Sequence, residues 1–285
     1  MKKLLILLCI FPAAVFSQTI NKKLQHKVDE LIKGYKGNIG IYIKSLKSGK
    51  TVRINADTVF PTASIVKVPI LIGIINKIKE GELTYHQEVA YHDSMLYAGV
   101  DILGSFKNGE KIELSKLIML MLSMSDNTAS LWLQKLAGTG SVVNELMEKN
   151  GFVHTRVNSR TVGRESDRTQ YGWGQTTPME MGEVFEKLYR GAIINDSLSK
   201  KMIRLLGRNY WDEGALSQIP ATTFVASKSG AVDASRNEIL LVMAKEPYIL
   251  SVFTKNNVDK TWSATNEAWV LTRKLSKIVF EYYSK

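Results

Sequence analysis

The sequence predicts an α/β fold, α+β by its connectivity, in which an antiparallel sheet flanked by helices accompanies an all-α lobe. Two alternating apolar runs around KSGK predict a β-hairpin over residues 38–57. Three more strands are predicted near the C-terminus, and residues from about 60 to 210 show the spacing of successive helices. We therefore expect one α/β lobe from residues 18–57 and 211–285, and an all-α lobe from residues 58–210.

The N-terminus, MKKLLILLCIFPAAVFSQT, has the layout of a secretory signal peptide. Two lysines precede an apolar run from Leu4 to about Phe16, and small and polar residues follow. The run is shorter than the roughly 18 residues that a membrane-spanning helix needs. We expect a signal peptide over residues 1–17, cleaved after Ser17, and a catalytic domain over 18–285. The protein is then exported, periplasmic or secreted, without stable membrane insertion after processing.

The cysteine count and the charge restrict the chemistry. Cys9 is the only cysteine and lies in the apolar run, so the mature chain would have no disulfide, thiol nucleophile or cysteine zinc site. The net charge of +11 becomes +9 when Lys2 and Lys3 are removed. A basic exported protein suits acidic cell-wall or membrane surfaces better than nucleic acid, and solubility alone explains the charge at least as well. We expect no nucleic-acid partner.

The first predicted elements are a helix and the hairpin. NKKLQHKVDELIKGY places Leu24, Val28 and Leu31 at helical spacing, and Gly49 lies in the hairpin turn. Several of the middle helices end at glycine, as helices often do. These helices are predicted in SIVKVPILIGIINKIKEGE, LSKLIMLMLSM, DNTASLWLQKLAG, SVVNELMEKNG, TPMEMGEVFEKLYRG and DSLSKKMIRLLGRN. The later strands are TTFVASKSG, SRNEILLVMAKE and YILSVFTK, and a last helix runs from about Asn266 to Tyr283.

The stretch FPTASIVKVPILIGII, residues 60–75, holds two polar side chains that stand out from an otherwise apolar or small run, Ser64 and Lys67. Residues three apart on a helix lie on one face about 5–6 Å apart at Cβ, so the hydroxyl and the amine can touch. A lysine on a buried helix must be paired or lose its proton. The same S-x-x-K spacing occurs at Ser197 and Lys200, where a polar helix start makes a capping serine the simpler interpretation.

Two further motifs follow in the chain. Ser125-Asp126-Asn127 falls between two apolar helices, where a helix N-cap is the structural alternative. Lys228-Ser229-Gly230 closes a predicted strand and is soon followed by Arg236. A second K-S-G at Lys47-Ser48-Gly49 lies in the hairpin turn, ahead of Ser64. The order S-x-x-K, S-D-N, K-[ST]-G is the motif set of penicillin-recognising serine enzymes.

From Phe60-Pro61 through MSDNTA to KSGA, the chain resembles the class A β-lactamase family and its penicillin-recognising relatives, over essentially the whole mature chain. The resemblance implies a β-lactamase/D,D-peptidase-like fold and a serine hydrolase without a cofactor. A serine hydroxyl is a poor nucleophile until a base takes its proton, and a lysine can do so when burial and a nearby cation lower its pKa. Lys67 suits that role, with Lys228 as the cation.

The resemblance also implies roles for the site residues. Ser64 is the nucleophile and Lys67 a base, Ser125 relays a proton to the leaving nitrogen, and Asn127 holds Lys67 and the substrate amide. The backbone N–H groups of Ser64 and Ala231 form the oxyanion hole.

The substrate carboxylate has its own set of residues in such enzymes. The resemblance implies that it is bound here by the Lys228-Ser229-Gly230 motif together with Arg236.

A deacylating glutamate is where the resemblance weakens. Class A β-lactamases carry it in an E-x-x-L-N pattern between S-D-N and K-[ST]-G, and it activates the water that cuts the acyl-enzyme. The corresponding region here, TRVNSRTVGRESDRTQYGWGQTTP, has Glu165 as its only glutamate, in ESDRT and some three residues later than expected. Glu165 is therefore a displaced catalytic residue, or a surface residue paired with Arg164 or Arg168.

Three functions from different classes follow. The first is an exported serine β-lactamase acting through a Ser64 acyl-enzyme. The second is a D,D-carboxypeptidase or penicillin-binding hydrolase acting on peptidoglycan stem peptides, the expected behaviour if no residue activates water. The third is a non-catalytic β-lactam sensor. We expect a monomer whose partner is a small β-lactam or a peptidoglycan peptide. Tyr97 could line the site mouth, and a tyrosine of the core or the surface is the structural alternative. A metallohydrolase fits poorly, because no histidine pair has ligand spacing; the histidines are His26, His86, His92 and His154.

Overall fold

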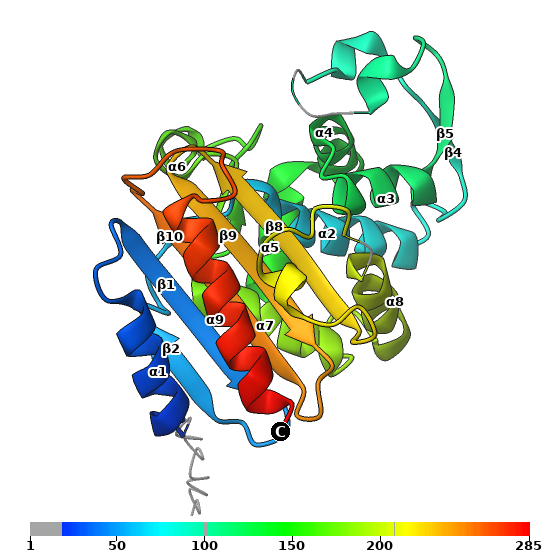
Figure 1. Ribbon diagram of the computed structural model, residues 1–285. Helices are drawn as coiled ribbons and strands as arrows, with labels where there is room; N and C mark the ends of the chain where they lie inside the picture. The colour runs from blue at the N-terminus through cyan, green and yellow to red at the C-terminus, as the bar shows by residue number, and fades with distance from the viewer. Residues whose placement is uncertain (1–18, 98, 100–101, 208) are drawn as a thin grey trace, which may run out of the picture.

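The computed structural model describes residues 19–97, 99, 102–207 and 209–285, so the predicted signal peptide lies outside the described residues. A five-stranded sheet forms its centre, with the spatial order β2-β1-β10-β9-β8 (Figure 1). All neighbouring strands in it are antiparallel. The strands are β1 (Asn38–Ser45), β2 (Thr51–Ile54), β8 (Val225–Val232), β9 (Ser235–Val242) and β10 (Tyr248–Lys255).

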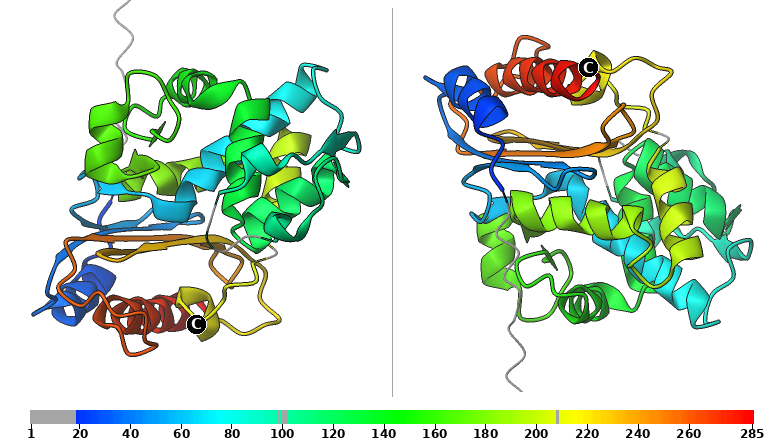
Figure 2. Two further views of the ribbon diagram at one scale, coloured as in Figure 1. Left: turned by 90° about the horizontal axis from the view of Figure 1, so that it is seen from above. Right: turned by 90° about the horizontal axis from the view of Figure 1, so that it is seen from below.

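The sheet is built from both ends of the chain, as the sequence predicts. The N-terminal hairpin β1-β2 joins the C-terminal strands through the pairing of β1 with β10. Helices cover both faces, which explains why β9 is buried along its full length. Figure 2 shows α1 (Lys22–Ile32) and α9 (Glu267–Tyr283) on one face and the remaining helices on the other.

Helix α7 approaches the sheet closely because glycines lie at the contact. A Cβ atom on Gly182 would lie 2.5 Å from a ring carbon of Tyr42, and one on Gly40 would lie 2.7 Å from Pro178. Only the absence of side chains lets α7 and β1 pack at this distance. The helices on this side are α2 (Lys67–Lys79), α3 (Leu114–Ser123), α4 (Asn127–Leu136), α5 (Thr139–Lys149), α6 (Glu165–Tyr171), α7 (Pro178–Tyr189) and α8 (Asp196–Leu206).

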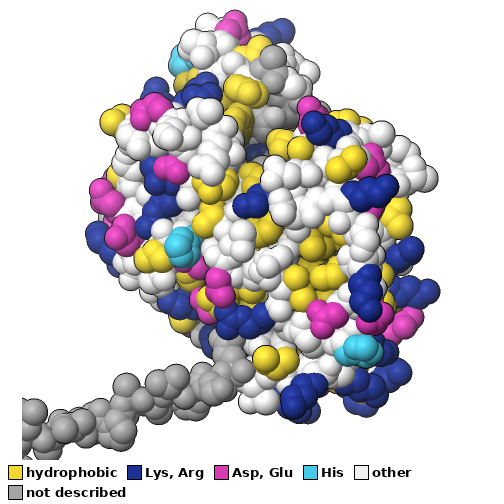
Figure 3. Space-filling model, turned by 90° about the vertical axis from the view of Figure 1, so that its left-hand side faces the viewer, with side chains coloured by type: hydrophobic (Ala, Val, Ile, Leu, Met, Phe, Trp, Pro, Cys, Tyr) yellow, Lys and Arg dark blue, Asp and Glu magenta, His cyan; other side chains and the backbone are white. Residues whose placement is uncertain are grey.

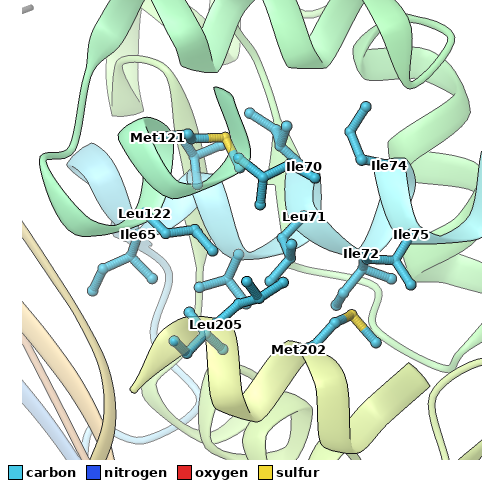
Figure 4. Close-up of a cluster of buried hydrophobic side chains, with 14 of the residues drawn as sticks. Ile65, Ile70, Leu71, Ile72, Ile74, Ile75, Met121, Leu122, Met202 and Leu205 are labelled. Carbon is cyan, nitrogen blue, oxygen red and sulfur yellow. The ribbon is translucent and has the colours of Figure 1, made fainter. Parts of the chain in front are cut away.

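Helix α2 is the centre of the helical part. Every residue from Lys67 to Ile75 is buried, as expected of a helix that is apolar all round. Figure 4 shows Ile70, Leu71 and Ile72 of α2 among side chains of the neighbouring helices, including Met202 of α8. The nucleophile candidate is thus attached to one of the best-packed helices of the molecule.

Several helices begin at side-chain caps. The side chains of these N-cap residues accept hydrogen bonds from backbone N–H groups in the first turn, which satisfies donors that the helix itself leaves unpaired. The capping residues are Asn21, Asp126, Thr177, Asn195 and Asn266. The interpretation of Ser197 as a cap was wrong, because Asn195 caps α8 and Ser197 is its second residue.

The structure adds short elements that the sequence pattern did not predict. Two small sheets are present, with orders β3-β7-β6 and β4-β5, and α6 is a further helix between β6 and β7. Such two- and three-residue strands are held by pairing with distant segments, so they leave no local periodicity. They are β3 (Phe60–Pro61), β4 (Glu88–Ala90), β5 (Lys111–Glu113), β6 (Arg156–Val157) and β7 (Gly174–Thr176). The 3₁₀ turns are η1 (Ala63–Val66), η2 (Asp93–Met95), η3 (Leu103–Ser105) and η4 (Ala215–Gln218).

Surface charge and the apolarity of the helices are two features that relate to where a protein resides. On the face in Figure 3, lysine and arginine side chains are scattered and interspersed with acidic ones. Among the described residues, none of the helices combines the length and apolarity needed to cross a membrane.

Candidate active site

Ser64 and Lys67 lie on one continuous turn of chain at the start of α2. Ser64 belongs to the 3₁₀ turn η1, and Lys67 is the first residue of α2. The Lys67 Nζ atom is 3.0 Å from the Ser64 Oγ atom, and the lysine side chain is fully buried. Ala63, just before the nucleophile, has φ of 45°, a left-handed conformation that costs free energy in a non-glycine residue. The contact predicted from the spacing of three residues is therefore present.

The S-D-N motif lies opposite, in the turn between α3 and α4. Lys67 Nζ is 2.6 Å from the Ser125 carbonyl oxygen, 3.0 Å from Ser125 Oγ and 3.0 Å from Asn127 Oδ1. Asp126 is buried and caps α4, with its Oδ1 accepting the N–H of Ala129 at 2.7 Å. The N-cap alternative is thus correct for Asp126, while Ser125 and Asn127 reach Lys67.

The partners of Lys67 determine where its lone pair can point when the amine is neutral. The Ser125 carbonyl and Asn127 Oδ1 can only accept hydrogen bonds. A neutral amine has two N–H hydrogens, and these two acceptors use both. The remaining lone pair can then accept the proton of a serine hydroxyl, and the Ser64 Oγ atom is within reach.

Lys228 completes the group from strand β8. Its Nζ atom is 3.1 Å from Ser125 Oγ and 2.8 Å from the Ser229 carbonyl oxygen, and its side chain is fully buried. Ser125 Oγ therefore lies between the two lysine amines. The structure brings together the three motifs from η1 and α2, from the α3-α4 turn and from β8.

Burial and mutual repulsion change the protonation of these lysines. Burial lowers the pKa of Lys67 well below its ordinary value, and the positive charge of Lys228 lowers it further. Burial also lowers the pKa of Lys228, to about 7, and the carboxyl group of Glu238 opposes this shift. Burial and the charge of Lys228 therefore favour the neutral form of Lys67, the form that can act as a base.

The backbone around Gly230 brings β8 against the nucleophile. A Cβ atom on Gly230 would lie 2.5 Å from the Thr62 carbonyl oxygen and 2.9 Å from the Ser64 nitrogen. Any larger residue would push the strand away, which gives the glycine of the K-S-G motif a physical reason. Ala231, the next residue, lines the same cavities as Ser64. The N–H groups of Ser64 and Ala231 are therefore candidates for a shared oxyanion hole.

Two cavities meet at Ser64, with volumes of about 650 Å³ and about 510 Å³. The larger, which we name the K-S-G cavity, extends along Ser229 and Arg236 toward α9. The smaller, which we name the loop cavity, is bounded by residues 170–173 and by Tyr97. Tyr97 packs edge-on against Trp173 at 4.9 Å between ring centroids. Tyr97 therefore lines the site, as the sequence suggested it could.

Glu165 is not brought together with the other predicted residues. It is exposed at the start of α6, where its Oε1 accepts the N–H of Gly163 at 3.2 Å. It lines neither cavity, and the ion pair of its neighbour Arg164 goes to Asp167 at 3.0 Å. Among the described residues lining the loop cavity there is no carboxylate.

Arg236 lines the K-S-G cavity but is held by surrounding groups. Its guanidinium carbon lies 4.4 Å from the ring centroid of Trp262 and 4.7 Å from that of Trp269. The Nη atoms donate to backbone carbonyl groups, including those of Ser235 at 3.0 Å and Thr261 at 3.0 Å. Nε is buried and has no hydrogen-bond partner among the described residues.

We expect Arg236→Lys to reduce the free energy of unfolding by about 1–3 kcal/mol, because lysine cannot stack between both indoles and satisfy the same carbonyl groups. Urea unfolding followed by circular dichroism measures the loss. Arg53→Lys is the matched control, since Arg53 is partly exposed and pairs with the exposed Asp57. Equal stability of the two variants would contradict the clamping role of Arg236.

The sequence analysis did not find Trp211, Glu213 or Glu238, which also line the K-S-G cavity. The run NYWDEG follows a predicted helix and carries no motif, so only its aromatic and acidic content was a signal. Among the described residues, no group of three or more metal-ligating side chains is present.

Comparisons with known proteins agree with this geometry. Residues 23–283 match the model of the β-lactamase enzyme family. The chain is 26% identical to β-lactamase VEB-1 of Pseudomonas aeruginosa, over 98% of this chain and 97% of that protein. The fold is similar to that of PBP-A, with a TM-score of 0.82, 19% identity, and 93% and 97% of the two chains covered. A β-lactamase structure from Sphaerobacter thermophilus gives a TM-score of 0.81 at 20% identity, covering 93% and 98%.

The family match spans nearly all of the described chain, and the motifs that carry the chemistry meet in one site. The predicted fold is thereby confirmed as well. The protein belongs to the β-lactamase enzyme family and is a serine hydrolase of the class A β-lactamase type.

Proposed function

We propose that this protein hydrolyses β-lactams through an acyl-enzyme on Ser64, with Lys67 as the base. The observation that carries the proposal is the position of the buried Lys67 amine, 3.0 Å from both Ser64 Oγ and Ser125 Oγ. A buried, neutral amine touching a serine hydroxyl is the arrangement that activates such a nucleophile.

Acylation follows from these contacts. Ser64 Oγ attacks the lactam carbonyl carbon and gives its proton to Lys67 Nζ, and the resulting oxyanion accepts the N–H groups of Ser64 and Ala231. When the C–N bond breaks, the nitrogen takes the Ser125 hydroxyl proton, and Lys67 returns a proton to Ser125. At the end Lys67 is neutral again, Ser125 has its proton back, and the lactam nitrogen has gained the proton that Ser64 lost.

Recognition of the substrate carboxylate falls to the other side of the K-S-G cavity. Lys228 is buried there, which lowers its pKa to about 7, and its protonated form offers the positive charge. Ser229 and Arg236 line the same cavity and supply a hydroxyl group and a second positive charge. This proposal keeps the residues that the family resemblance implies.

Deacylation is the step for which we propose a departure from the family pattern. Glu165 is exposed and lines neither cavity, so we assign water activation to Lys67, which the acylation cycle leaves neutral beside the ester. A water molecule attacks the acyl carbon and gives its proton to Lys67. When the ester C–O bond breaks, Lys67 passes that proton to Ser64 Oγ, so the acid product leaves and Lys67 is neutral again.

A D,D-peptidase acting on peptidoglycan stem peptides is the second candidate. It is favoured by the lack of a carboxylate among the described residues of the loop cavity. A variant of PBP-A, whose fold is similar, was captured as an acyl-enzyme complex with penicillin G. A site of this kind that acylates but does not activate water would retain the β-lactam.

We also propose that the mature protein is exported and acts as a monomer, without a nucleic-acid partner or stable membrane insertion. The signal-peptide layout of the first 17 residues supports export. The mixed surface charges in Figure 3 offer no single basic stripe on that face for a polyanion.

We expect the native enzyme to turn over a chromogenic β-lactam continuously, and Glu165→Gln to leave the steady-state rate within about twofold, because Glu165 does not reach Ser64. Stopped-flow absorbance and intact-protein mass spectrometry measure turnover and the adduct. Glu145→Gln, on an unrelated helix, is the matched control.

Two other outcomes would contradict parts of this proposal. A Glu165→Gln variant that stops after one burst with trapped adduct would restore Glu165 as the deacylating base. A single burst in the native enzyme, with release of D-alanine from a stem-peptide mimic, would make the protein a penicillin-binding peptidase.

A further inference from the structure

Glu238 is a buried carboxylate for which the proposed mechanism has no use. It lies on β9, only 4% exposed, and its backbone pairs directly with Ser229 of the K-S-G motif. A buried carboxylate requires compensating hydrogen bonds, so its partners indicate its role.

The partners of Glu238 belong to a segment that precedes β8. Its Oε2 accepts the N–H of Ala215 at 2.7 Å, and its Oε1 accepts the N–H of Leu216 at 3.3 Å. The preceding Gly214 packs so closely that a Cβ atom there would lie 2.2 Å from Oε2. The carboxylate thus fits against the backbone of residues 214–216.

The other end of this segment is attached to the S-D-N side of the site. Trp211 Nε1 donates to the Met124 carbonyl oxygen at 2.9 Å, and Met124 immediately precedes Ser125. We name residues 211–216 the pocket wall, because Trp211, Glu213 and Gly214 line the K-S-G cavity. The pocket wall is therefore anchored at one end beside Ser125 and at the other by Glu238, opposite Ser229.

We propose that Glu238 is a positioning residue, which fixes the pocket wall between the S-D-N and K-S-G motifs so that the K-S-G cavity is preformed for the substrate. The inference rests on the proposed function, since a preformed cavity matters only if Ser64 is acylated by a ligand there. Preorganised walls speed acylation because the substrate need not order them on binding.

The charges around Glu238 make this positioning dependent on pH. The charged groups that act on Glu238 are Lys228, on the neighbouring strand β8, and Glu213, in the pocket wall. Arg236 precedes it by two residues on the same face of β9. Burial raises the pKa of Glu238 to about 7, against the effect of the backbone N–H groups and Lys228. Above that pH the carboxylate is ionised and accepts both N–H groups strongly. Below it, protonation removes one acceptor and loosens the pocket wall.

We expect Glu238→Gln to lower the second-order acylation rate constant for a carboxylate-bearing β-lactam by about 5- to 30-fold at pH 8, the size of a lost charge-assisted hydrogen bond. Backbone hydrogen exchange in the peptide covering residues 211–219 should become faster in the variant. In the native enzyme the rate should also fall in a step near pH 7, in addition to the acid limb set by Lys67, and only this step should be missing in Glu238→Gln.

Two further variants separate positioning from general destabilisation. Glu180→Gln alters another buried carboxylate that accepts backbone N–H groups, those of residues 153–155, and that lines neither cavity. It should leave exchange in the pocket wall and the step near pH 7 unchanged. Glu238→Asp keeps a titrating carboxylate but shortens its reach, so the step should persist while exchange becomes faster.

The proposal is overturned if Glu238→Gln leaves exchange in residues 211–219 as in the native protein. It is also overturned if Glu238→Gln and Glu180→Gln lower the rate equally with identical pH profiles. Hydrogen exchange needs no substrate, so a native enzyme that forms no acyl-enzyme would contradict the proposed function and still leave the anchoring of the wall measurable.

Discussion

Replacing Ser64 with alanine is expected to abolish the covalent β-lactam adduct and to lower the acylation rate by about 10³- to 10⁶-fold, because no other hydroxyl can take its place in the attack. Ser125 Oγ also touches Lys67, but it lies between two amines and serves as a donor to the leaving nitrogen. Intact-protein mass spectrometry after incubation with a β-lactam measures the adduct, and competition with a chromogenic reporter measures the rate.

The chain supplies its own control for this experiment. Ser197 and Lys200 repeat the S-x-x-K spacing in the first turn of α8, where Lys200 pairs with Asp196 at 2.7 Å and both side chains are exposed. Ser197→Ala should therefore form the adduct at the native rate. An adduct of unchanged yield in Ser64→Ala would contradict the assignment of the nucleophile, whatever Ser197→Ala does.

The sequence predicts those contacts of the site that join residues close together in the chain. Ser64 and Lys67 are three residues apart, so the helical spacing alone brings the hydroxyl and the amine into contact. A different local pattern excludes the second K-S-G, Lys47-Ser48-Gly49, as the substrate-binding motif. Apolar residues alternate on both sides of it, which places it in the turn between β1 and β2. The central sheet and most helices were also predicted from local patterns, namely apolar periodicity and glycines at helix ends.

The part that the sequence does not predict depends on contacts between distant segments. The path of the chain from β6 to β7 is fixed by pairing of two- and three-residue strands, so a count along the sequence could not show that Glu165 would be exposed. Likewise, Glu238 meets backbone groups 22 and 23 residues away, and Trp211 meets a carbonyl group 87 residues away. No local pattern encodes such pairs, although a glutamate within an apolar strand is a signal that a buried partner exists.

Lys67→Arg is the second substitution with a large expected effect, a loss of about 10³- to 10⁴-fold in acylation. An arginine stays protonated at every pH that the protein tolerates, so it can donate to the acceptors around it but cannot take the Ser64 proton. The acceptors themselves, the Ser125 carbonyl and Asn127 Oδ1, would remain satisfied. Burial and the charge of Lys228 disfavour a fixed charge at this position, so the variant should also be less stable, and thermal unfolding measures that loss. The acylation rate is therefore measured below the unfolding transition, where a loss of rate in the folded variant identifies the missing base. Lys200→Arg, in the exposed copy of the motif, is the matched control.

The acylation rate should depend on pH through the protonation of Lys67. Burial and the charge of Lys228 hold the pKa of Lys67 well below its ordinary value, which favours the neutral amine. The active form is the neutral one, and the rate must fall as the pH drops through the pKa of Lys67 in the folded protein. Removing the neighbouring cation with Lys228→Met should raise the pKa of Lys67, so the acid limb should move to higher pH. An acid limb that stays in place in Lys228→Met, or an arginine variant that acylates at the native rate, would show that another group accepts the Ser64 proton.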